Sequence, residues 1–567
     1  MSVEASRCHD FWNLGERKVL ERLRSPIAFA LATSLFILTF DNWRFWSETL
    51  SATRLDTPEE VFFLLSIGVI VVLLQAVVLL AAPRILPLRV FAITAILVAA
   101  VTGFFIDSYS VVVDKEMIRN LFETDTREAA AFLVPKFAVY VLMLGILPAV
   151  IAARFKLTTP TVKNGSLQRI GFVALALATC LGLFLASFPH FTSFFGEHKT
   201  QNLLNPAQPV IGLVAFVQSS LAAVSTTFVD DAANHAQLLP TPKGKPLLLF
   251  LVVGESARAA NFQLGGYQRP TNRELARVTG LHYFTHAKSC GTSTAFSVPC
   301  MFSPTGRQNF DVAETRRHSN LVDALASAGF DVEWRDNNSS SKGVAARVPV
   351  ISFVRGDKAA ACGPEGCLDE QTLEGLPSRL AGLTQNTVIV FHDLGSHGPA
   401  YWKRYPAKFE HFKPVCRTSE LWTCSQESLV NTYDNTILYA DHVLAERIRL
   451  LQSVSEKADT LLIYVSDHGE SLGEHGIYLH GAPYAIAPKE QTTVPYLIWM
   501  SPEYRDRVSV DTTCIQSKQG DSISHDSLYH TVLGALGARN AFYRPELDIV
   551  GPCWRNKMPT VSRAQLP

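Results

Sequence analysis

The sequence predicts a protein of two parts: an N-terminal α-helical membrane domain with five spans, followed by an α/β domain built on a parallel sheet. Up to about residue 190, apolar runs of roughly 20 residues recur, the length that a helix needs to cross a bilayer. Beyond residue 246, the apolar runs shorten to strand length and alternate with helical segments. We therefore divide the chain into a transmembrane domain (1–190), bridging helices with a linker (191–245) and an α/β domain (246–567).

The expected spans are the five longest apolar runs, at 26–43, 61–82, 88–106, 132–153 and 168–187. Arg84 and Arg89 lie between the second and third runs, and Arg154 and Lys156 lie between the fourth and fifth. Because cytoplasmic loops carry an excess of Lys and Arg, these loops and the N-terminus are predicted to be cytoplasmic. An odd number of spans then places everything after residue 190 on the outer side.

A further apolar stretch, Pro209–Phe228, is either a sixth span or a bridging helix at the membrane surface. Eight of the ten cysteines lie beyond residue 289, and the first six of these form three close sequence pairs, as expected in an oxidising compartment. A sixth span would return these cysteines to the reducing side, so we favour the bridging helix. A structural zinc site is the other interpretation of the cysteines, but the sequence contains no Cys-x-x-Cys.

The charge balance gives no sign of a polyanionic partner. Lys and Arg together number 51, and Asp and Glu also number 51, so the formal net charge is zero. A nucleic-acid-binding protein typically shows a basic excess. We therefore expect no nucleic-acid partner.

In the α/β domain, three continuous apolar runs read as strands buried on both faces: 247–253, 387–391 and 460–465. Helices are expected at 320–328 and 429–451. Each of the three strands is followed at once by polar residues. Because ligands gather beyond the carboxyl ends of parallel strands, these three polar clusters are predicted to share one site.

The polar clusters contain the ligands that a zinc ion takes. Glu255 follows the first strand, and Asp467 and His468 follow the third. Each has an ordinary alternative, since Glu255 is also placed to cap a helix and Asp-His-Gly is good turn chemistry. The segment 289–303 adds a Thr/Ser cluster between Cys290 and Cys300, in which Thr292, Ser293 and Thr294 are all candidate nucleophiles. A hydroxyl, two carboxylates and an imidazole together fit zinc-assisted nucleophilic catalysis.

Three further polar residues have open roles. His397 and His480 each precede a glycine in a loop and could be second metal ligands, proton donors or solvated surface histidines. Lys342, in a polar loop, could offset phosphate charge, although a solvated lysine is the ordinary expectation.

Several long motifs, in one order along the chain, resemble the lipid A phosphoethanolamine transferases, which include the mobile colistin-resistance enzymes. The motifs are Val-Gly-Glu255-Ser-Ala-Arg, Ser289–Ser303, Trp334-Arg-Asp-Asn-Asn-Ser-Ser-Ser-Lys342-Gly, His397-Gly-Pro-Ala-Tyr-Trp-Lys-Arg-Tyr405, Val465-Ser-Asp-His-Gly-Glu-Ser-Leu-Gly-Glu474 and Ala487-Pro-Lys-Glu-Gln491. The resemblance covers essentially the whole chain, including the membrane spans.

The resemblance implies an alkaline-phosphatase/sulfatase-like catalytic domain in the periplasm of a bacterial inner-membrane enzyme. It implies one or two zinc ions, with Glu255, Thr294, Asp467 and His468 as ligands and Thr294 as the nucleophile. Lys342, His397 and His480 match positions that contact the phosphoethanolamine group or a second zinc. We expect the enzyme to act as a monomer.

In the outer loop after the third span, Met117–Glu128 matches a family segment that approaches the ethanolamine head group. Its Asn120, Thr124 and Glu128 are four residues apart, so one helical face could carry all three. The close cysteine pairs of the family are present as 290/300, 362/367 and 416/424, with 514/553 as a candidate fourth bridge.

The implied reaction transfers phosphoethanolamine from phosphatidylethanolamine to a phosphate of lipid A through a phosphoethanolamine-threonine intermediate. It would lower the negative charge of lipid A and give polymyxin resistance. Three alternatives stay open at this point: another acceptor, such as a lipopolysaccharide core sugar or a periplasmic glucan; a membrane-anchored phosphodiesterase or sulfatase; and a catalytically inactive lipid-binding protein.

Overall fold

The structure of the chain is a computed structural model, and it divides into two compact units. Unit 1 comprises residues 1–113 and 133–211, and unit 2 comprises residues 114–132 and 212–567. The residues that the structure describes are 24–53, 55–81, 87–124, 126–158, 162–224, 227–231, 234–239, 244–360, 362–363 and 366–554. The short segment 114–132 therefore belongs with the α/β domain, although in sequence it lies between apolar helices.

Unit 1 is made of apolar helices. Among the described residues, four helical stretches are long and apolar enough to cross a membrane, and a fifth is obtained when α2 and α3 are taken as one bent span. The helices are α2 (Pro26–Phe40), α3 (Trp43–Ala52), α4 (Pro58–Leu80), α5 (Leu88–Tyr109), α8 (Pro135–Tyr140), α9 (Leu147–Arg154), α10 (Val162–Ala186) and α11 (Phe188–His198). A π-helical turn, Val141–Ile146, joins α8 to α9. The structure thus supports four to five spans, and the predicted five are obtained if α2 and α3 form one bent span.

The first predicted span, 26–43, is not one straight helix, because the chain bends by 66° between α2 and α3. The bend falls at Asn42, whose side-chain amide donates to the carbonyl oxygens of Ile37 (3.0 Å) and Asn205 (2.8 Å). These bonds offer the backbone an alternative to continuing the helix. The apolar stretch predicted as a bridging helix forms α12 (Ala207–Val224), whose apolar part, Ala207–Leu221, is shorter than the spans.

Unit 2 is built on an eight-stranded sheet with the strand order β11-β3-β10-β7-β2-β6-β4-β5. Neighbouring strands are parallel except at β10, which runs antiparallel to both β3 and β7. The strands are β2 (Leu247–Gly254), β3 (Leu281–Lys288), β4 (Asp331–Asp336), β5 (Val350–Ser352), β6 (Thr387–His392), β7 (Asp459–Ser466), β10 (Thr493–Met500) and β11 (Ser522–Ser524). All three predicted strands lie next to one another at the centre, as β7-β2-β6.

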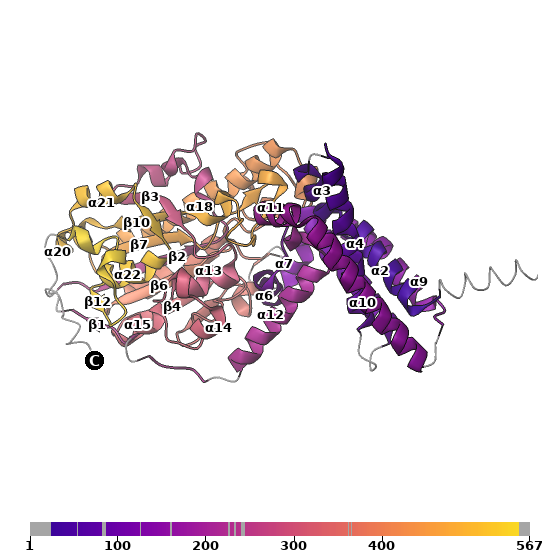
Figure 1. Cartoon of the computed structure of the whole chain (residues 1–567). Helices are drawn as coiled ribbons and strands as arrows, with labels where there is room; N and C mark the ends of the chain where they lie inside the picture. Colours follow the sequence, from indigo (N-terminus) through magenta and orange to yellow (C-terminus); the bar gives the residue numbers. More distant parts are fainter. Residues whose placement is uncertain are drawn as a thin grey trace, which may run out of the picture. The chain divides into compact units, whose positions relative to one another are not determined.

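Helices cover both faces of this sheet (Figure 1). Every residue of β2 is buried, and its side chains alternate between the two faces. Leu249 and Leu251 belong to the core that also contains residues of α13, α15 and α22. On the other face, the ring of Phe250 contacts Phe391 of β6, and Arg447 of α18 lies over Phe391. The continuous apolar run of β2 thus reflects burial on both sides.

Both predicted helices of unit 2 are present, as α15 and α18. Asn320 caps α15 and forms a capping box with Asp323. The helices of unit 2 are α6 (Lys115–Glu123), α7 (Thr126–Ala131), α13 (Thr294–Met301), α14 (Val312–Thr315), α15 (Leu321–Ser327), α16 (Asp357–Ala360), α17 (Leu376–Ala381), α18 (Gln426–Ser453), α19 (Lys489–Thr492), α20 (Pro502–Val508), α21 (Thr512–Lys518) and α22 (Asp526–Ala535).

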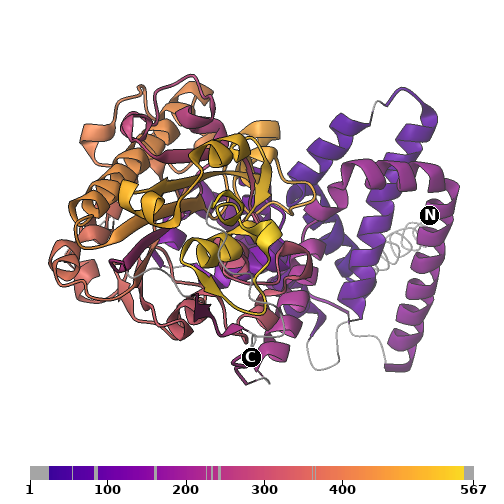
Figure 2. The ribbon, with the colours of Figure 1, turned by 90° about the vertical axis from the view of Figure 1, so that its left-hand side faces the viewer.

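Four disulfides join the cysteines of unit 2 in the predicted pairs. The pairs are Cys290–Cys300, Cys362–Cys367, Cys416–Cys424 and Cys514–Cys553. Short strand pairs complete the unit: β1 (Gln237–Leu238) with β12 (Ala538–Arg539), and β8 (Ser471–Leu472) with β9 (Tyr478–Leu479). In Figure 2, as in Figure 1, the yellow C-terminal segments lie within the same α/β unit as the earlier strands.

A buried ion pair ties α18 to the end of β6. The guanidinium of Arg447 is fully buried and donates to both carboxylate oxygens of Asp393, at 2.7 and 2.6 Å, and to Thr372 at 2.9 Å. Arg447→Met would leave the Asp393 carboxylate buried without its partner, so we expect it to lower the free energy of unfolding by about 3–5 kcal/mol. Chemical denaturation of the full-length protein in detergent measures this.

The matched control is Arg449→Met on the same helix, because Arg449 is exposed and pairs with Glu274 and Glu446 at the surface. Its loss should cost no more than about 1 kcal/mol. Equal losses for the two variants would contradict the assignment of Arg447 and Asp393 as a buried structural pair.

Candidate active site

The predicted ligands meet at the carboxyl edge of the central strands. Glu255 follows β2, and Asp467 and His468 follow β7, its parallel neighbour. All three side chains are fully buried. The Asp467 carboxylate accepts hydrogen bonds from the backbone N–H groups of Ser256 (3.2 Å) and His468 (2.7 Å), which fix its orientation. The strand-end rule therefore brought these residues together correctly.

Thr294 supplies the hydroxyl of this cluster. It is the first residue of α13, after the N-cap Ser293, and only 4% of it is exposed. Its Oγ1 donates to Glu255 Oε2 at 3.0 Å and lies 3.2 Å from His468 Nε2. Thr292, in contrast, donates its hydroxyl to the carbonyl oxygen of Ala482 at 2.6 Å. Among the candidate hydroxyls, the Thr294 hydroxyl is thus hydrogen-bonded within the cluster.

Where the side chains of the cluster converge, they present oxygen and nitrogen atoms whose lone pairs can bind a metal ion. His468 Nδ1 lies 2.8 Å from the carbonyl oxygen of Gly469, which assigns the proton to Nδ1 and leaves the lone pair of Nε2 facing the cluster. Nε2 lies 3.3 Å from Asp467 Oδ2 and 3.5 Å from Glu255 Oε1. Asp467 Oδ2 is buried and has no hydrogen-bond donor. This orphaned oxygen, beside one imidazole nitrogen, one hydroxyl and a second carboxylate, fits a divalent cation with N and O ligands.

The protonation of the two carboxylates leads to the same conclusion. Burial raises the pKa of Asp467 well above its usual range, and the negative charge of Glu255 raises it further. Burial also acts to raise the pKa of Glu255, but positive charges on His468, His397 and His480, when these rings are protonated, outweigh it and lower that pKa. With these imidazoles neutral, two neighbouring buried carboxylates need another positive charge if both are to be ionised. A divalent cation would supply that charge.

Two of the predicted histidines lie beside the cluster. The ring of His480 lies 4.3 Å from the ring of His468, and the ring of His397 lies 5.4 Å from that of His480 (centroid distances). His480 Nδ1 is 2.8 Å from Glu470 Oε2, and the other carboxylate oxygen, Oε1, accepts a hydrogen bond from Tyr401 at 2.5 Å. These contacts hold His480 in one orientation beside the cluster. A ring nitrogen of His480 lies close enough to ligand atoms of Glu255 and His468 for the three residues to bind one ion.

Most of the remaining predicted residues lie in helix α6 or near its C-terminal end. Lys342 is buried and donates its ammonium to the Glu123 carbonyl oxygen (3.3 Å) and to Ser339 Oγ (2.5 Å). Asn120 is in α6, and Thr124 directly follows it and donates to the Asn120 carbonyl oxygen at 2.6 Å. The prediction for Glu128 concerns a side chain outside those that the structure describes. The roles of these residues stay predictions.

The structure adds residues that sequence reasoning missed. Asn338 donates its side-chain amide to Glu255 Oε2 at 2.8 Å, and Ser256 donates its hydroxyl to Glu255 Oε1 at 2.6 Å. The Ser256 backbone is left-handed, with φ of 54°, and the Tyr433 hydroxyl donates to its carbonyl oxygen at 2.6 Å. Asn338 follows β4, so the strand-end rule would have found it if that strand had been predicted.

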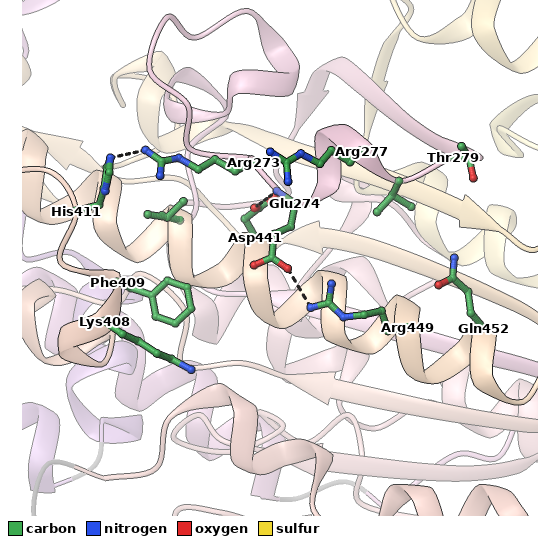
Figure 3. A pocket seen from close by; sticks show the side chains of 12 residues that line it. Arg273, Glu274, Arg277, Thr279, Lys408, Phe409, His411, Asp441, Arg449 and Gln452 are labelled. Carbon is green, nitrogen blue, oxygen red and sulfur yellow. Dashed lines mark hydrogen bonds and ion pairs between the residues drawn. The ribbon is translucent and has the colours of Figure 1, made fainter.

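A separate cavity of about 680 Å³ is lined by basic and acidic side chains (Figure 3). Thr279 of its lining lies just before β3, which runs parallel to β7, so this lining lies at the sheet edge opposite Glu255 and Asp467. Arg273 contacts His411, and Arg449 pairs with Glu274 at 2.9 Å. No predicted site residue lines the cavity. We therefore assign it no part in the chemistry of the strand-end cluster.

The Cys290–Cys300 disulfide closes the segment that carries Thr294. Replacing both cysteines with serine should lower the free energy of unfolding by about 2–4 kcal/mol, because the cross-link restricts the unfolded chain. We also expect lower activity per folded molecule, since α13 would be less constrained. Denaturation and activity assays of the purified full-length variant measure the two effects.

The matched control is the Cys416→Ser/Cys424→Ser double variant, which opens a bridge of similar sequence separation, 8 against 10 residues, away from Thr294. It should lose stability but keep its activity per folded molecule. Equal activity losses for the two pairs would contradict a specific role of the Cys290–Cys300 bridge.

Comparisons with known families match both parts of the chain. A family model described as Phosphoethanolamine transferase EptA/EptB matches residues 68–221. A family model described as Sulfatase matches residues 248–538. The second match covers every residue of the strand-end cluster.

Similar proteins match over nearly the full length. Phosphoethanolamine transferase EptA of Salmonella typhimurium is 37% identical over 93% of this chain and 97% of its own length. Phosphatidylethanolamine transferase Mcr-1 of Escherichia coli is 36% identical over 90% of this chain and 94% of its own. The integral membrane lipooligosaccharide phosphoethanolamine transferase A of Neisseria meningitidis has a TM-score of 0.88 and 31% identity, and the match covers 94% of this chain and 99% of that one. The chain therefore belongs to the membrane phosphoethanolamine transferases, which join an EptA/EptB-type membrane domain to a sulfatase-type catalytic domain.

Proposed function

We propose that this protein transfers phosphoethanolamine from phosphatidylethanolamine to a phosphate group of lipid A, with Thr294 as the nucleophile. The observation that carries the proposal is the position of Thr294 Oγ1. It lies 3.0 Å from Glu255 and 3.2 Å from His468, inside the buried strand-end cluster. The hydroxyl stands at the N-terminus of α13, where the helix dipole favours negative charge on an attacking oxygen and on a phosphoryl group.

The proposed cofactor is zinc, held by Glu255, Thr294, Asp467 and His468. A bound zinc ion would favour the alkoxide form of Thr294 at neutral pH, with the hydroxyl proton released to solvent. Glu255 is held in place by hydrogen bonds from Ser256 and Asn338, and Asp467 by two backbone N–H groups. These contacts keep the donor atoms in place before substrate arrives.

In the first half-reaction, Thr294 Oγ forms a bond to the phosphorus of phosphatidylethanolamine. The bond from phosphorus to the diacylglycerol oxygen breaks, and that oxygen takes a proton from His397 or His480. Phosphoethanolamine is then bound to Thr294, and diacylglycerol stays in the membrane. In the second half-reaction, a lipid A phosphate oxygen attacks the same phosphorus, the bond to Thr294 breaks, and Thr294 Oγ is protonated again.

The choice of lipid A as the acceptor rests on the resemblance of the site motifs to the lipid A phosphoethanolamine transferases, and the similar Neisseria meningitidis protein is named as a lipooligosaccharide phosphoethanolamine transferase. A second candidate acceptor is a core sugar. It is suggested by the Kdo(2)-lipid A phosphoethanolamine 7''-transferase of Escherichia coli, which is 25% identical over 79% of this chain. The EptA proteins of Salmonella typhimurium and Escherichia coli are more similar, at 36–37% identity, and the family resemblance implies a phosphate of lipid A, so we propose the phosphate.

The test is mass spectrometry of lipid A from a polymyxin-sensitive Gram-negative host that expresses the full-length chain. We expect a phosphoethanolamine increment on lipid A, and fragmentation should place it on a phosphate. The added ammonium should also raise the polymyxin concentration that the host survives, because cationic peptides bind less well to a less anionic surface. An increment found only on core sugars would select the second acceptor, and no increment with stable protein would contradict transfer to this class of lipid.

A further inference from the structure

Helix α6 packs within the catalytic unit. In sequence it lies in the loop between apolar helices α5 and α8, but it lies against α13, whose first residue is Thr294. Lys115, its first residue, pairs with Asp311 at 3.7 Å, and the sulfur of Met117 lies close to Gly481, next to His480. The end of α6 that carries Asn120 and Glu123 therefore belongs to the same compact unit as the reactive hydroxyl.

Two cations of the catalytic domain hold the last residue of α6. The two terminal nitrogens of Arg316 donate to the two carboxylate oxygens of Glu123, at 2.8 and 2.9 Å. The ammonium of Lys342 donates to the Glu123 carbonyl oxygen at 3.3 Å. A two-point arginine–carboxylate contact fixes direction as well as distance. A cation at the C-terminal carbonyl groups of a helix is favourable in addition.

Hydrogen bonds continue from this contact to the reactive cluster. Lys342 donates to Ser339 Oγ at 2.5 Å, and Ser339 donates to Asn338 Oδ1 at 3.2 Å. Asn338 in turn donates to Glu255 Oε2 at 2.8 Å, the oxygen to which Thr294 also donates. An unbroken chain of contacts thus links the last residue of α6 to the nucleophile.

The backbone conformation and the burial of Lys342 restrict where its ammonium group can lie. Its backbone is left-handed, with φ of 51°, which is unfavourable for a residue with a side chain, and the residue is only 3% exposed. Its ammonium needs acceptors in a buried place, and the recorded ones are Ser339 and the Glu123 carbonyl. If α6 moved away, the ammonium would lose one of these two acceptors.

We propose that Glu123 and Arg316 are positioning residues for donor binding. Their ion pair seats α6 on the catalytic domain, and a seated α6 sets the places of Asn120, Thr124 and Lys342 relative to Thr294. The proposal rests on the proposed function, because the donor is the phosphatidylethanolamine head group. Weakening the pair lowers the fraction of molecules with α6 seated and raises the apparent KM for the donor by the same factor. Once donor is bound at saturation, α6 is seated, so kcat changes little.

The test compares Arg316→Gln with Arg317→Gln in the full-length, zinc-loaded protein in proteoliposomes. The neighbouring Arg317 pairs with Glu314 on its own turn at 2.7 Å, so its replacement removes the same charge one residue away without touching α6. For Arg316→Gln, we expect the KM for phosphatidylethanolamine to rise about tenfold, with kcat within twofold of the wild type. Arg317→Gln should leave both unchanged.

Glu123→Gln should match Arg316→Gln, and the double variant should be no worse than either single variant, because both remove the same interaction. Hydrogen exchange without substrate gives a readout independent of turnover. The amides of residues 118–123 should exchange faster in Arg316→Gln but not in Arg317→Gln. An unchanged KM, an equal fall in kcat, additive effects in the double variant, or the same exchange in both arginine variants would each overturn the proposal.

The failure of the proposed function would look different. A wild-type protein that releases no diacylglycerol from phosphatidylethanolamine would contradict the function and, with it, the donor role of the ion pair. The exchange comparison would still decide whether Arg316 seats α6.

Discussion

Thr294→Ala is expected to reduce phosphoethanolamine transfer by roughly 10⁴-fold or more, the scale of loss seen when a covalent nucleophile is removed. Alanine keeps the backbone of α13 but removes the oxygen that lies 3.0 Å from Glu255 and 3.2 Å from His468. The rate is measured as diacylglycerol release from phosphatidylethanolamine in proteoliposomes, and the product as the lipid A mass increment in cells. Both should vanish together, because the covalent intermediate precedes both.

Three variants separate nucleophile loss from damage to the segment. Thr294→Ser keeps a hydroxyl and should retain measurable transfer, with some loss because serine is less restricted at χ1. Thr292→Val removes a hydroxyl bonded to the Ala482 carbonyl oxygen, and Ser293→Ala removes one with no capping bond, so both should stay active. Full diacylglycerol release by folded Thr294→Ala, or loss of activity only in Thr292→Val, would move the nucleophile elsewhere.

Asp467→Asn is expected to lower zinc affinity by at least about 100-fold and activity in proportion. Asp467 Oδ2 is buried without a donor, and the amide that replaces the carboxylate removes the charge that draws a divalent ion to it. The zinc content after dialysis against a chelator measures the affinity change. In the wild type, zinc should also raise the unfolding temperature, because ligands that bind only the folded state stabilise it, and Asp467→Asn should lack this response.

Asp506→Asn is the control for this experiment, since it removes an exposed carboxylate of the same domain. Its zinc content and thermal response should equal those of the wild type. An Asp467→Asn variant that keeps full zinc through dialysis would contradict the assignment of Asp467 as a ligand. A wild type that binds no zinc would contradict the cofactor itself.

The sequence was sufficient to place the centre of the site. Glu255 and Asp467 directly follow buried apolar strands, and parallel neighbours end at the same edge, so local patterns alone brought the two carboxylates together. The helix α15 was also predicted from a local pattern, because Leu321, Leu325 and Ala328 recur at helical spacing. These elements could be predicted because their apolar patterns are continuous along the sequence.

The contacts that surround the site could not be predicted in the same way. Strand β4 has a charged residue in Arg335, so it lacks the apolar run that would reveal a strand, and Asn338 was missed with it. The pairing of Glu123 with Arg316 joins residues far apart in sequence, and no local pattern in either segment indicates it. Such information lies in the three-dimensional packing.

The disulfides have a consequence for how the domain matures. The eight bridged cysteines form four pairs of consecutive cysteines, at separations of 10, 5, 8 and 39 residues, so no bridge encloses or crosses another. Each of the first three pairs becomes available as soon as a short length of chain has been exported, and short loops close at little entropic cost. Oxidation in order of export therefore yields the native pairing. A host needs a thiol oxidase to produce this protein, but it should have little need of a disulfide isomerase.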